Sequence, residues 1–221
     1  MAENSIYITF RIDQSAPDFP ELVQKYRALR LDALTNAKAA FGSTYEEESA
    51  WPIEYWEQRL TRQGVEHFVI AAHRPSGEQE WLGQLVLLGP LSLEDFTLGP
   101  ESGQPEDQFE NAAKETRWQL TALYTSIHHR GKGLGKLLCR AAISYAANFD
   151  KDKRARVRLF LSPYNTGIMR FYADLGFCDG GRCTWEEAMI SNGNEAQLPP
   201  PSDRDPEKYQ TRIGIAMILV T

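Results

Sequence analysis

Cysteine is scarce in this chain of 221 residues, which has only 3, at Cys139, Cys178 and Cys183. A small, odd number excludes the disulfide framework of a small secreted domain, so we expect a reducing, cytoplasmic setting. Cys178 and Cys183 are close in sequence, but no nearby histidine or second cysteine pair completes the four ligands of a structural zinc site. The sequence therefore predicts no metal.

Long apolar runs and blocks of positive charge are also missing. No run approaches the ~20 residues that a membrane-spanning helix needs. The N-terminal stretch MAENSIYITF lacks the basic head and apolar segment of a signal peptide. The chain has 24 lysines and arginines against 30 acidic residues, and its net charge is −6. Nucleic-acid binding needs clustered positive charge. We therefore expect neither a membrane nor a nucleic acid as partner.

What the chain does contain is an alternation of apolar strands and amphipathic helices. Strands are expected at residues 6–12, 67–73, 81–89, 118–127, 155–163 and 209–221. The turn RPSGEQ should make the second and third of these antiparallel neighbours. Helices are expected around residues 22–34, within EEESAWPIEYWEQRL with Ser49 as its cap, from residue 134, and over residues 165–176.

Two stretches break this alternation. Residues 90–116 and 184–207 are rich in proline, glycine and acidic residues, so we expect them to be irregular insertions. No internal repeat or linker divides the rest. The economical prediction is a single domain over residues 1–221, with one mixed sheet and helices on both faces.

The most informative stretch is HRGKGLGKLL, residues 129–138. Its glycines alternate at the head of an apolar, alanine-rich helix and are flanked by positive side chains. A helix N-terminus offers free N–H groups and a partial positive charge, and glycines let the backbone approach a pyrophosphate closely. A bend that binds nothing is the alternative.

Two common phosphate loops do not fit this stretch. A P-loop needs glycine five residues before Gly135, where Arg130 stands, and a hydroxyl residue after Lys136, where Leu137 stands. A dinucleotide-binding turn needs G-x-G-x-x-G, and Lys136 occupies its last position. Both are excluded.

A third pattern does fit. The sequence R-x-x-G-x-G, carried by Arg130, Gly133 and Gly135, resembles the acyl-CoA loop of the GCN5-related N-acetyltransferase (GNAT) superfamily. Asn165 begins N-x-x-x-x-x-F-Y-x-x-x-G-F, which resembles that family's next strand-to-helix segment. Upstream, ALRLDALTNAKAAFGSTYEEE and the tryptophan-rich stretch after it resemble its substrate-side helices. The resemblance implies a mixed, mostly antiparallel central sheet with splayed middle strands and helices on both faces.

The resemblance also implies a reaction and its binding residues. Acetyl-CoA is the expected acyl donor, and the acceptor is a primary amine of a small molecule or peptide that attacks the thioester directly in a ternary complex. The backbone of residues 123–125 would face the pantetheine arm and the thioester carbonyl. Asn165 would bind the pantetheine amides or serve only as a helix N-cap. The donor-binding residues are Leu123, Tyr124, Thr125, Arg130, Gly131, Lys132, Gly133, Leu134, Gly135, Lys136 and Asn165.

Tyr172 is the predicted catalytic residue, as the acid that protonates the departing thiolate. Packing against the sheet is its alternative role. The general base stays open, because residues 118–127 contain no carboxylate and Glu115 lies just outside. Water relays and the acidic run at residues 46–48 are the candidates, and that run also fits a solvated surface.

The remaining expectations concern single side chains, alternative functions and the oligomeric state. Trp51 and Trp56 are candidates for either the core or the wall of the acceptor pocket, and Cys139 is expected to be a buried thiol. A non-catalytic acyl-CoA sensor and transfer to oxygen are the alternative functions. A homodimer is a further option.

Overall fold

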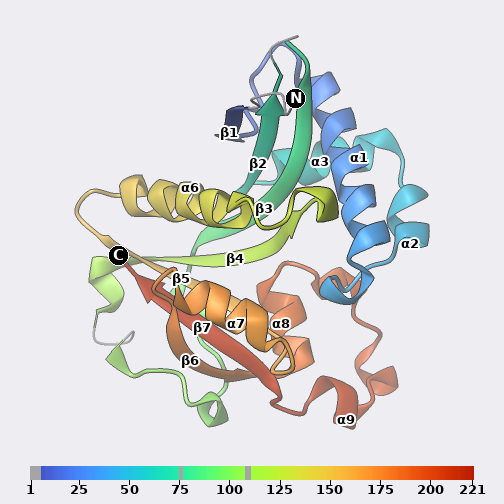
Figure 1. Ribbon diagram of the computed structural model, residues 1–221. Coiled ribbons are helices and arrows are strands. Elements are labelled where there is room, and N and C mark those ends of the chain that lie inside the picture. The colour runs from blue at the N-terminus through green and yellow to red at the C-terminus, as the bar shows by residue number, and fades with distance from the viewer. Residues whose placement is uncertain (1–5, 75–76, 108–110) are drawn as a thin grey trace. The chain divides into compact units, whose positions relative to one another are not determined.

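Seven strands form the sheet of the computed structural model, which describes residues 6–74, 77–107 and 111–221 (Figure 1). Residues 1–5, Pro75 and Ser76 of the expected turn, and residues 108–110 of the first expected insertion lie outside this range. The strands are β1 (Ile6–Arg11), β2 (Val65–His73), β3 (Gln79–Leu91), β4 (Glu115–Thr125), β5 (Arg154–Leu161), β6 (Cys178–Cys183) and β7 (Gly214–Val220).

The strands are hydrogen-bonded in the order β1-β2-β3-β4-β5-β7-β6. β4 and β5 are parallel, whereas β1–β2, β5–β7 and β6–β7 are antiparallel. The paired register of β4 and β5 runs from Glu115–Arg154 to Gln119–Arg158, and both strands continue beyond it, as splayed middle strands require. The predicted mixed, mostly antiparallel sheet is confirmed.

The chain divides into two compact units. The first unit comprises residues 1–87 and 122–142, and the second comprises residues 88–121 and 143–221. Strands β3 and β4 and helix α6 (Leu134–Phe149) contribute residues to both. The single domain over residues 1–221 stays a prediction.

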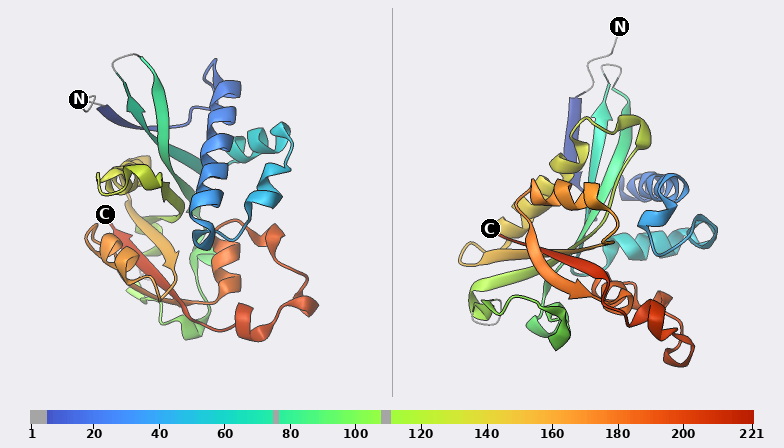
Figure 2. Two further views of the ribbon diagram at one scale, coloured as in Figure 1. Left: turned by 45° about the vertical axis from the view of Figure 1, so that its right-hand side comes forward. Right: turned by 60° about the horizontal axis from the view of Figure 1, so that its bottom comes forward.

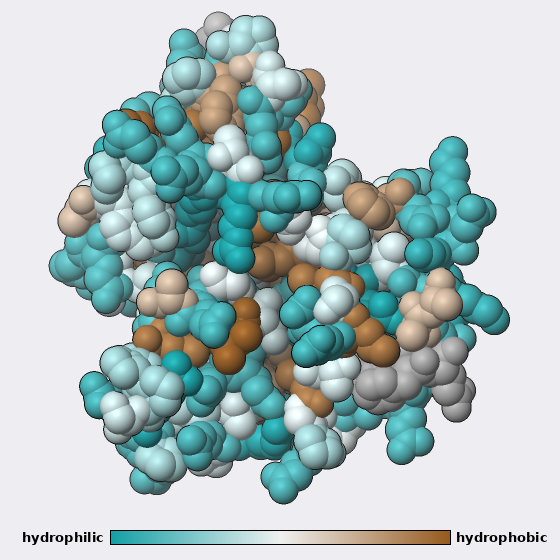
Figure 3. Space-filling view, turned by 180° about the vertical axis from the view of Figure 1, so that it is seen from behind, coloured by the Kyte–Doolittle hydropathy of each residue, from teal (hydrophilic) through white to brown (hydrophobic). Residues whose placement is uncertain are grey.

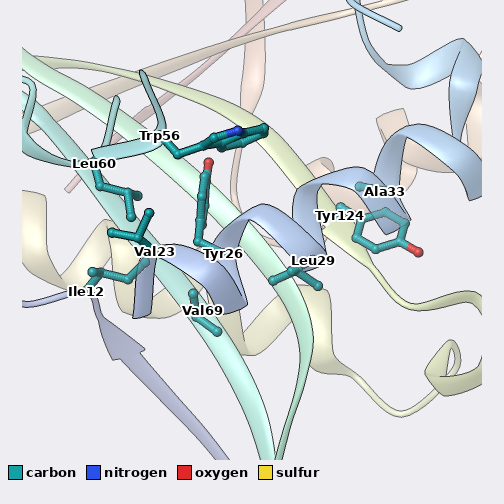
Figure 4. Close-up of a cluster of buried hydrophobic side chains, with 9 residues drawn as sticks. All are labelled: Ile12, Val23, Tyr26, Leu29, Ala33, Trp56, Leu60, Val69 and Tyr124. Atoms are coloured by element: carbon teal, nitrogen blue, oxygen red, sulfur yellow. The ribbon is translucent and has the colours of Figure 1, made fainter. Parts of the chain in front are cut away.

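In the first unit, helices α1 (Phe19–Asn36), α2 (Tyr45–Ser49) and α3 (Ile53–Thr61) lie on one side of β2 and β3 (Figure 2). Tyr26 and Leu29 of α1 belong to one buried cluster with Val69 of β2 (Figure 4). The next residue, Ile70, points to the opposite face, where Leu138 of α6 approaches Gly83. Helices therefore cover both faces of these strands.

The helical region after α1 differs from the prediction. The sequence EEESAWPIEYWEQRL belongs to two helices, and Ser49 is the last residue of α2 instead of a cap. Thr44 caps α2, because its hydroxyl accepts the Glu47 N–H at 3.2 Å while the Glu47 carboxylate accepts the Thr44 N–H at 2.8 Å. Pro52, which has extended backbone angles, is the N-cap residue of α3 and directly precedes its first residue, Ile53.

In the second unit, β7 lies between β5 and β6, and Trp118 of β4 packs edge-on against Phe149 of α6 with centroids 5.0 Å apart. Its other helices are α4 (Leu93–Phe96), α7 (Thr166–Ala173), α8 (Trp185–Ser191) and α9 (Pro206–Tyr209). The prediction that residues 90–116 and 184–207 are irregular was partly wrong. These two stretches contain α4, α8 and the first residues of α9, and β3 and β4 extend into the limits of the first insertion. Strand β6 was not predicted.

The surface agrees with the composition. On the face shown in Figure 3, hydrophilic residues predominate and apolar ones form small patches. Among the helices of the described residues, none is long and apolar enough to cross a bilayer.

Candidate active site

The glycine turn joins β4 to α6 through a short 3₁₀ segment, Ile127–His129. Gly131 and Gly133 have φ values of 78° and 77°, the left-handed region that only glycine adopts readily. A Cβ atom at either position would meet no atom of the described residues within 4 Å, so this space is open. The turn and its Arg130 and Lys132 are exposed, and α6 begins at Leu134. The backbone conformation thus requires glycine at both positions, and the space beside the turn, here called the cradle, is open.

Strand β4 has an irregular backbone near its C-terminal end, shortly before the glycine turn. Ala122 has φ 56°, a left-handed conformation that costs a non-glycine residue roughly 1–2 kcal/mol. Such a residue breaks the regular pleat of a strand. It immediately precedes residues 123–125, the segment predicted to present backbone groups to a thioester. That role stays a prediction.

Tyr124, in the same segment, makes a contact that sequence reasoning missed. Its hydroxyl donates to Asp32 Oδ2 of α1 at 2.7 Å, and Asn36 Nδ2 donates to Asp32 Oδ1 at 2.8 Å. Burial, together with this hydrogen bond to a carboxylate, raises the pKa of Tyr124 above its ordinary value, so the phenol keeps its proton. The two partners are 92 residues apart, and no local signal links them.

Two predicted residues belong to the second unit. Asn165 caps α7, because its Oδ1 accepts the Ile168 N–H at 3.1 Å, and its side chain is exposed. Tyr172 is 4% exposed and packs edge-on against Phe171 and Phe177, at centroid distances of 5.0 and 5.5 Å. The capping and packing roles are therefore present. The roles of Asn165 and Tyr172 toward an acyl-CoA stay predictions.

Of the acids considered for the general base, Glu48 and Glu115 are held in buried ion pairs, whereas the other two acids of the run at residues 46–48 are exposed. Glu48 is fully buried and ion-paired to Arg30, so the acidic run is not simply a solvated surface. Burial alone would raise the pKa of Glu48, but hydrogen bonds and charge from Arg30 lower it. Glu115 is buried and paired with Arg156. Carboxylates held this way are structural.

Two other expectations have different outcomes. Trp56 is fully buried in the core beside Tyr26, which is the first of the two roles considered for it. The rings of Trp51 and Tyr55 are tilted by 44° to each other, with their centroids 4.3 Å apart. Cys139 is a buried thiol as predicted, and burial raises its pKa to about 12, which makes it a poor nucleophile. Within the described residues, no group of His, Cys, Asp and Glu could hold a metal.

His67 of β2 gives a prediction about pH. It is buried against the ring of Tyr26, and burial lowers its pKa from 6.5 to about 3. Below pH 6.5 the unfolded chain therefore binds a proton that the folded chain does not, so stability falls as pH falls. Carboxylates whose pKa is lowered by folding add to this loss mainly below about pH 5, where the unfolded chain begins to protonate them. We expect urea denaturation to show a loss of about 2 kcal/mol between pH 6.5 and 4.5.

His67→Gln should remove most of that slope, whereas His128→Gln, at an exposed position, should keep it. An equal slope in wild type and His67→Gln would contradict the assignment.

The strand order, with its parallel β4–β5 pair and the glycine turn before α6, defines an acetyltransferase fold. NAA60 of Arabidopsis thaliana, solved with a bisubstrate analogue, is 12% identical, with 98% of this chain and 99% of that chain covered and a TM-score of 0.56. A GNAT-family acetyltransferase of Streptococcus pneumoniae is 13% identical, with coverages of 98% and 100% and a TM-score of 0.55. A variant of the Vibrio cholerae spermidine N-acetyltransferase is 12% identical, with coverages of 97% and 93% and a TM-score of 0.52.

The acetyltransferase (GNAT) family model matches residues 31–177, and the chain belongs to this family. It is accordingly an N-acetyltransferase, and enzymes of this family use acetyl-CoA as cosubstrate. The curated proteins contain no match.

Proposed function

We propose that this enzyme binds acetyl-CoA with its pyrophosphate on the glycine turn and transfers the acetyl group to a primary amine of a small molecule or peptide. The observation that carries the proposal is the open, left-handed backbone at Gly131 and Gly133, directly before the N-terminus of α6. Free helix N–H groups and nearby cationic side chains attract phosphate oxygens. The residues assigned to this cradle are Arg130, Gly131, Lys132, Gly133, Leu134, Gly135 and Lys136.

The backbone of Leu123, Tyr124 and Thr125 is assigned to the pantetheine arm and the thioester carbonyl. An N–H donor to the developing oxyanion is typically worth ~2.7–4 kcal/mol. Asn165 is assigned to the pantetheine amides, and Tyr172 to protonation of the thiolate. In a direct transfer the amine nitrogen forms the new C–N bond, the C–S bond breaks, and the sulfur leaves as a thiol once it is protonated.

The negative net charge of −6 favours a cationic acceptor. The named activity of the spermidine N-acetyltransferase, which shares the fold, is consistent with this choice.

A matched pair of glycine variants tests the cradle. Gly133→Trp should abolish acetyl-CoA binding in isothermal titration, because the indole would occupy the space left for phosphate. Gly103→Trp is the control: Gly103 has φ 65°, and a Cβ there also meets no atom within 4 Å. Both variants carry the same kind of backbone strain, roughly 1–2 kcal/mol. Only Gly133→Trp should lose binding.

Equal binding of acetyl-CoA by both variants would show that the cofactor does not bind at the glycine turn. No binding by the wild-type chain would overturn the proposal. Turnover is then measured with butylamine, spermidine and a short peptide with a free N-terminus. Binding without turnover on a broader panel of amines and alcohols would favour the sensor.

A further inference from the structure

The contact between β4 and α1 leads to an inference that rests on the proposed function. Tyr124 belongs to the segment assigned to the thioester, and its hydroxyl donates to Asp32 at 2.7 Å. We infer that this pair receives the acceptor: the ammonium group binds at the Tyr124 hydroxyl oxygen, and its first proton passes to Asp32.

The Tyr124 side chain is held in one orientation. It is 3% exposed and belongs to the buried cluster that includes Leu29 and Ala33 of α1. Figure 4 shows its oxygen directed away from the other side chains of this cluster. The hydroxyl hydrogen is used toward Asp32, and the Asn36 amide faces the same oxygen as a hydrogen-bond donor, so one lone pair remains to accept a hydrogen bond from an ammonium group. The packing of the apolar ring in this cluster fixes the position of the hydroxyl oxygen.

Asp32 has the charge that the task requires. Its two carboxylate oxygens accept hydrogen bonds from Tyr124 and Asn36, both neutral donors. In the part of the chain that the structure describes, Asp32 forms no salt bridge. Glu48, by contrast, is paired with Arg30, and Glu66 with Arg11. The negative charge of Asp32 is therefore available to a cation.

Asp32 is also more accessible to solvent than Tyr124, which is buried. A proton taken from the buried side of the pair can thus be returned to water from the accessible side. The sequence leaves water relays open for this step. The structure supplies a carboxylate at the solvent end of such a relay, carried by α1.

The proton transfers balance. The ammonium group donates one proton to the Tyr124 oxygen as the tyrosine passes its own proton to Asp32, and the neutral amine then attacks the thioester carbon. The C–N bond forms, and the C–S bond breaks when the intermediate collapses. The second amine proton leaves with the thiol, through the acid assigned to Tyr172. Asp32 releases the first proton to solvent, so the cycle yields an amide, a thiol and one proton.

Tyr124→Phe and Asp32→Asn test the pair, using the fastest amine of the butylamine, spermidine and peptide panel. General acid–base groups contribute ~10²–10⁴-fold, so each variant should lose about 100-fold or more of kcat/KM at pH 7. The double variant should be no more than a few-fold slower than either single one, because the two residues act as a unit. The deficit should shrink as pH rises toward the pKa of the amine, since the free amine no longer needs a proton acceptor.

Two controls separate this role from a structural one. Tyr26→Phe removes a hydroxyl from the same buried cluster and should leave turnover unchanged. Acetyl-CoA should bind Tyr124→Phe and Asp32→Asn within about twofold of wild type, as measured by titration. Loss of fold alone would lower binding and turnover together at every pH.

Variants within threefold of wild-type turnover at every pH, with acetyl-CoA still bound, would overturn the inference and leave the proposed function intact. A wild-type chain that binds acetyl-CoA but acetylates no amine would overturn the inference and leave only the donor site. A wild-type chain that does not bind acetyl-CoA would overturn both.

Discussion

Glu48→Ala is expected to lower the free energy of unfolding by about 3–5 kcal/mol. Glu48 is fully buried and accepts hydrogen bonds from Arg30 Nε at 2.9 Å and Arg30 Nη2 at 2.6 Å. The hydroxyl of Ser43 also donates to it, and Arg59 Nη1 lies 3.6 Å from Oε2. Alanine would leave two cations without a carboxylate, and Arg30 is 4% exposed. Urea denaturation at pH 7 measures the loss.

The neighbour Glu46 offers a matched control. It is exposed in the same helix, so Glu46→Ala should stay within about 0.5 kcal/mol of wild type. Combining Glu48→Leu with Arg30→Met should recover stability relative to Glu48→Leu alone, because the buried guanidinium is removed with its partner. A Glu48→Ala variant that loses less than about 1 kcal/mol would show that the pair is not needed.

Glu115→Ala should cost about 3 kcal/mol, the second large effect. Glu115 accepts from Arg156 Nε at 2.6 Å and from Arg156 Nη2 at 3.1 Å, and both side chains are buried. Asp107 Oδ2 also lies 2.8 Å from Arg156 Nη2, but its side chain is 55% exposed, so it compensates only in part. At ~2–4 °C per kcal/mol for a chain of this size, the midpoint of thermal unfolding should fall by roughly 6–12 °C.

Glu101→Ala, at an exposed position in the same unit, should leave the midpoint in place. The Glu115→Leu, Arg156→Met double variant should unfold at a higher temperature than Glu115→Leu alone. A shift under about 2 °C for Glu115→Ala would mean that Asp107 suffices to hold the charge of Arg156.

Local chemistry explains which features the sequence could predict. The glycine turn was predictable because Gly131 and Gly133 adopt left-handed angles that other residues resist. Helix α1 was predictable from apolar spacing, since Val23, Tyr26 and Leu34 are all buried on one face. Each of these signals lies within a few residues of the feature it determines.

The missed elements lack such a signal or carried one that was overlooked. CDGGRC has little strand propensity, and β6 forms because it pairs with β7, from Cys178–Ile218 to Cys183–Gly214. Helix α8 did carry a readable start, Thr184 followed three residues later by Glu187, and the structure contains that capping box. The proline-rich sequence nearby favoured an irregular stretch over a helix.

Burial of charge was the hardest property to predict. The alternation in ARVRLFLSP indicated one apolar face, and Arg156 and Arg158 alternate with it. Both are nevertheless buried, and the guanidinium of Arg158 stacks 4.2 Å from the ring of Phe96, 62 residues earlier in the chain. The Tyr124–Asp32 pair is missed for the same reason. Such contacts depend on which distant segment covers a strand, and strand periodicity does not contain that information.

The division into two units limits how this enzyme can be dissected. The chain passes between them three times, between residues 87 and 88, 121 and 122, and 142 and 143, each time inside a strand or helix. A gene fragment ending at any of these points would cut β3, β4 or α6 and expose unpaired backbone. At none of these three points does a linker allow the units to be separated by truncation. Work on donor binding and acceptor binding must rely on point substitutions in the intact chain.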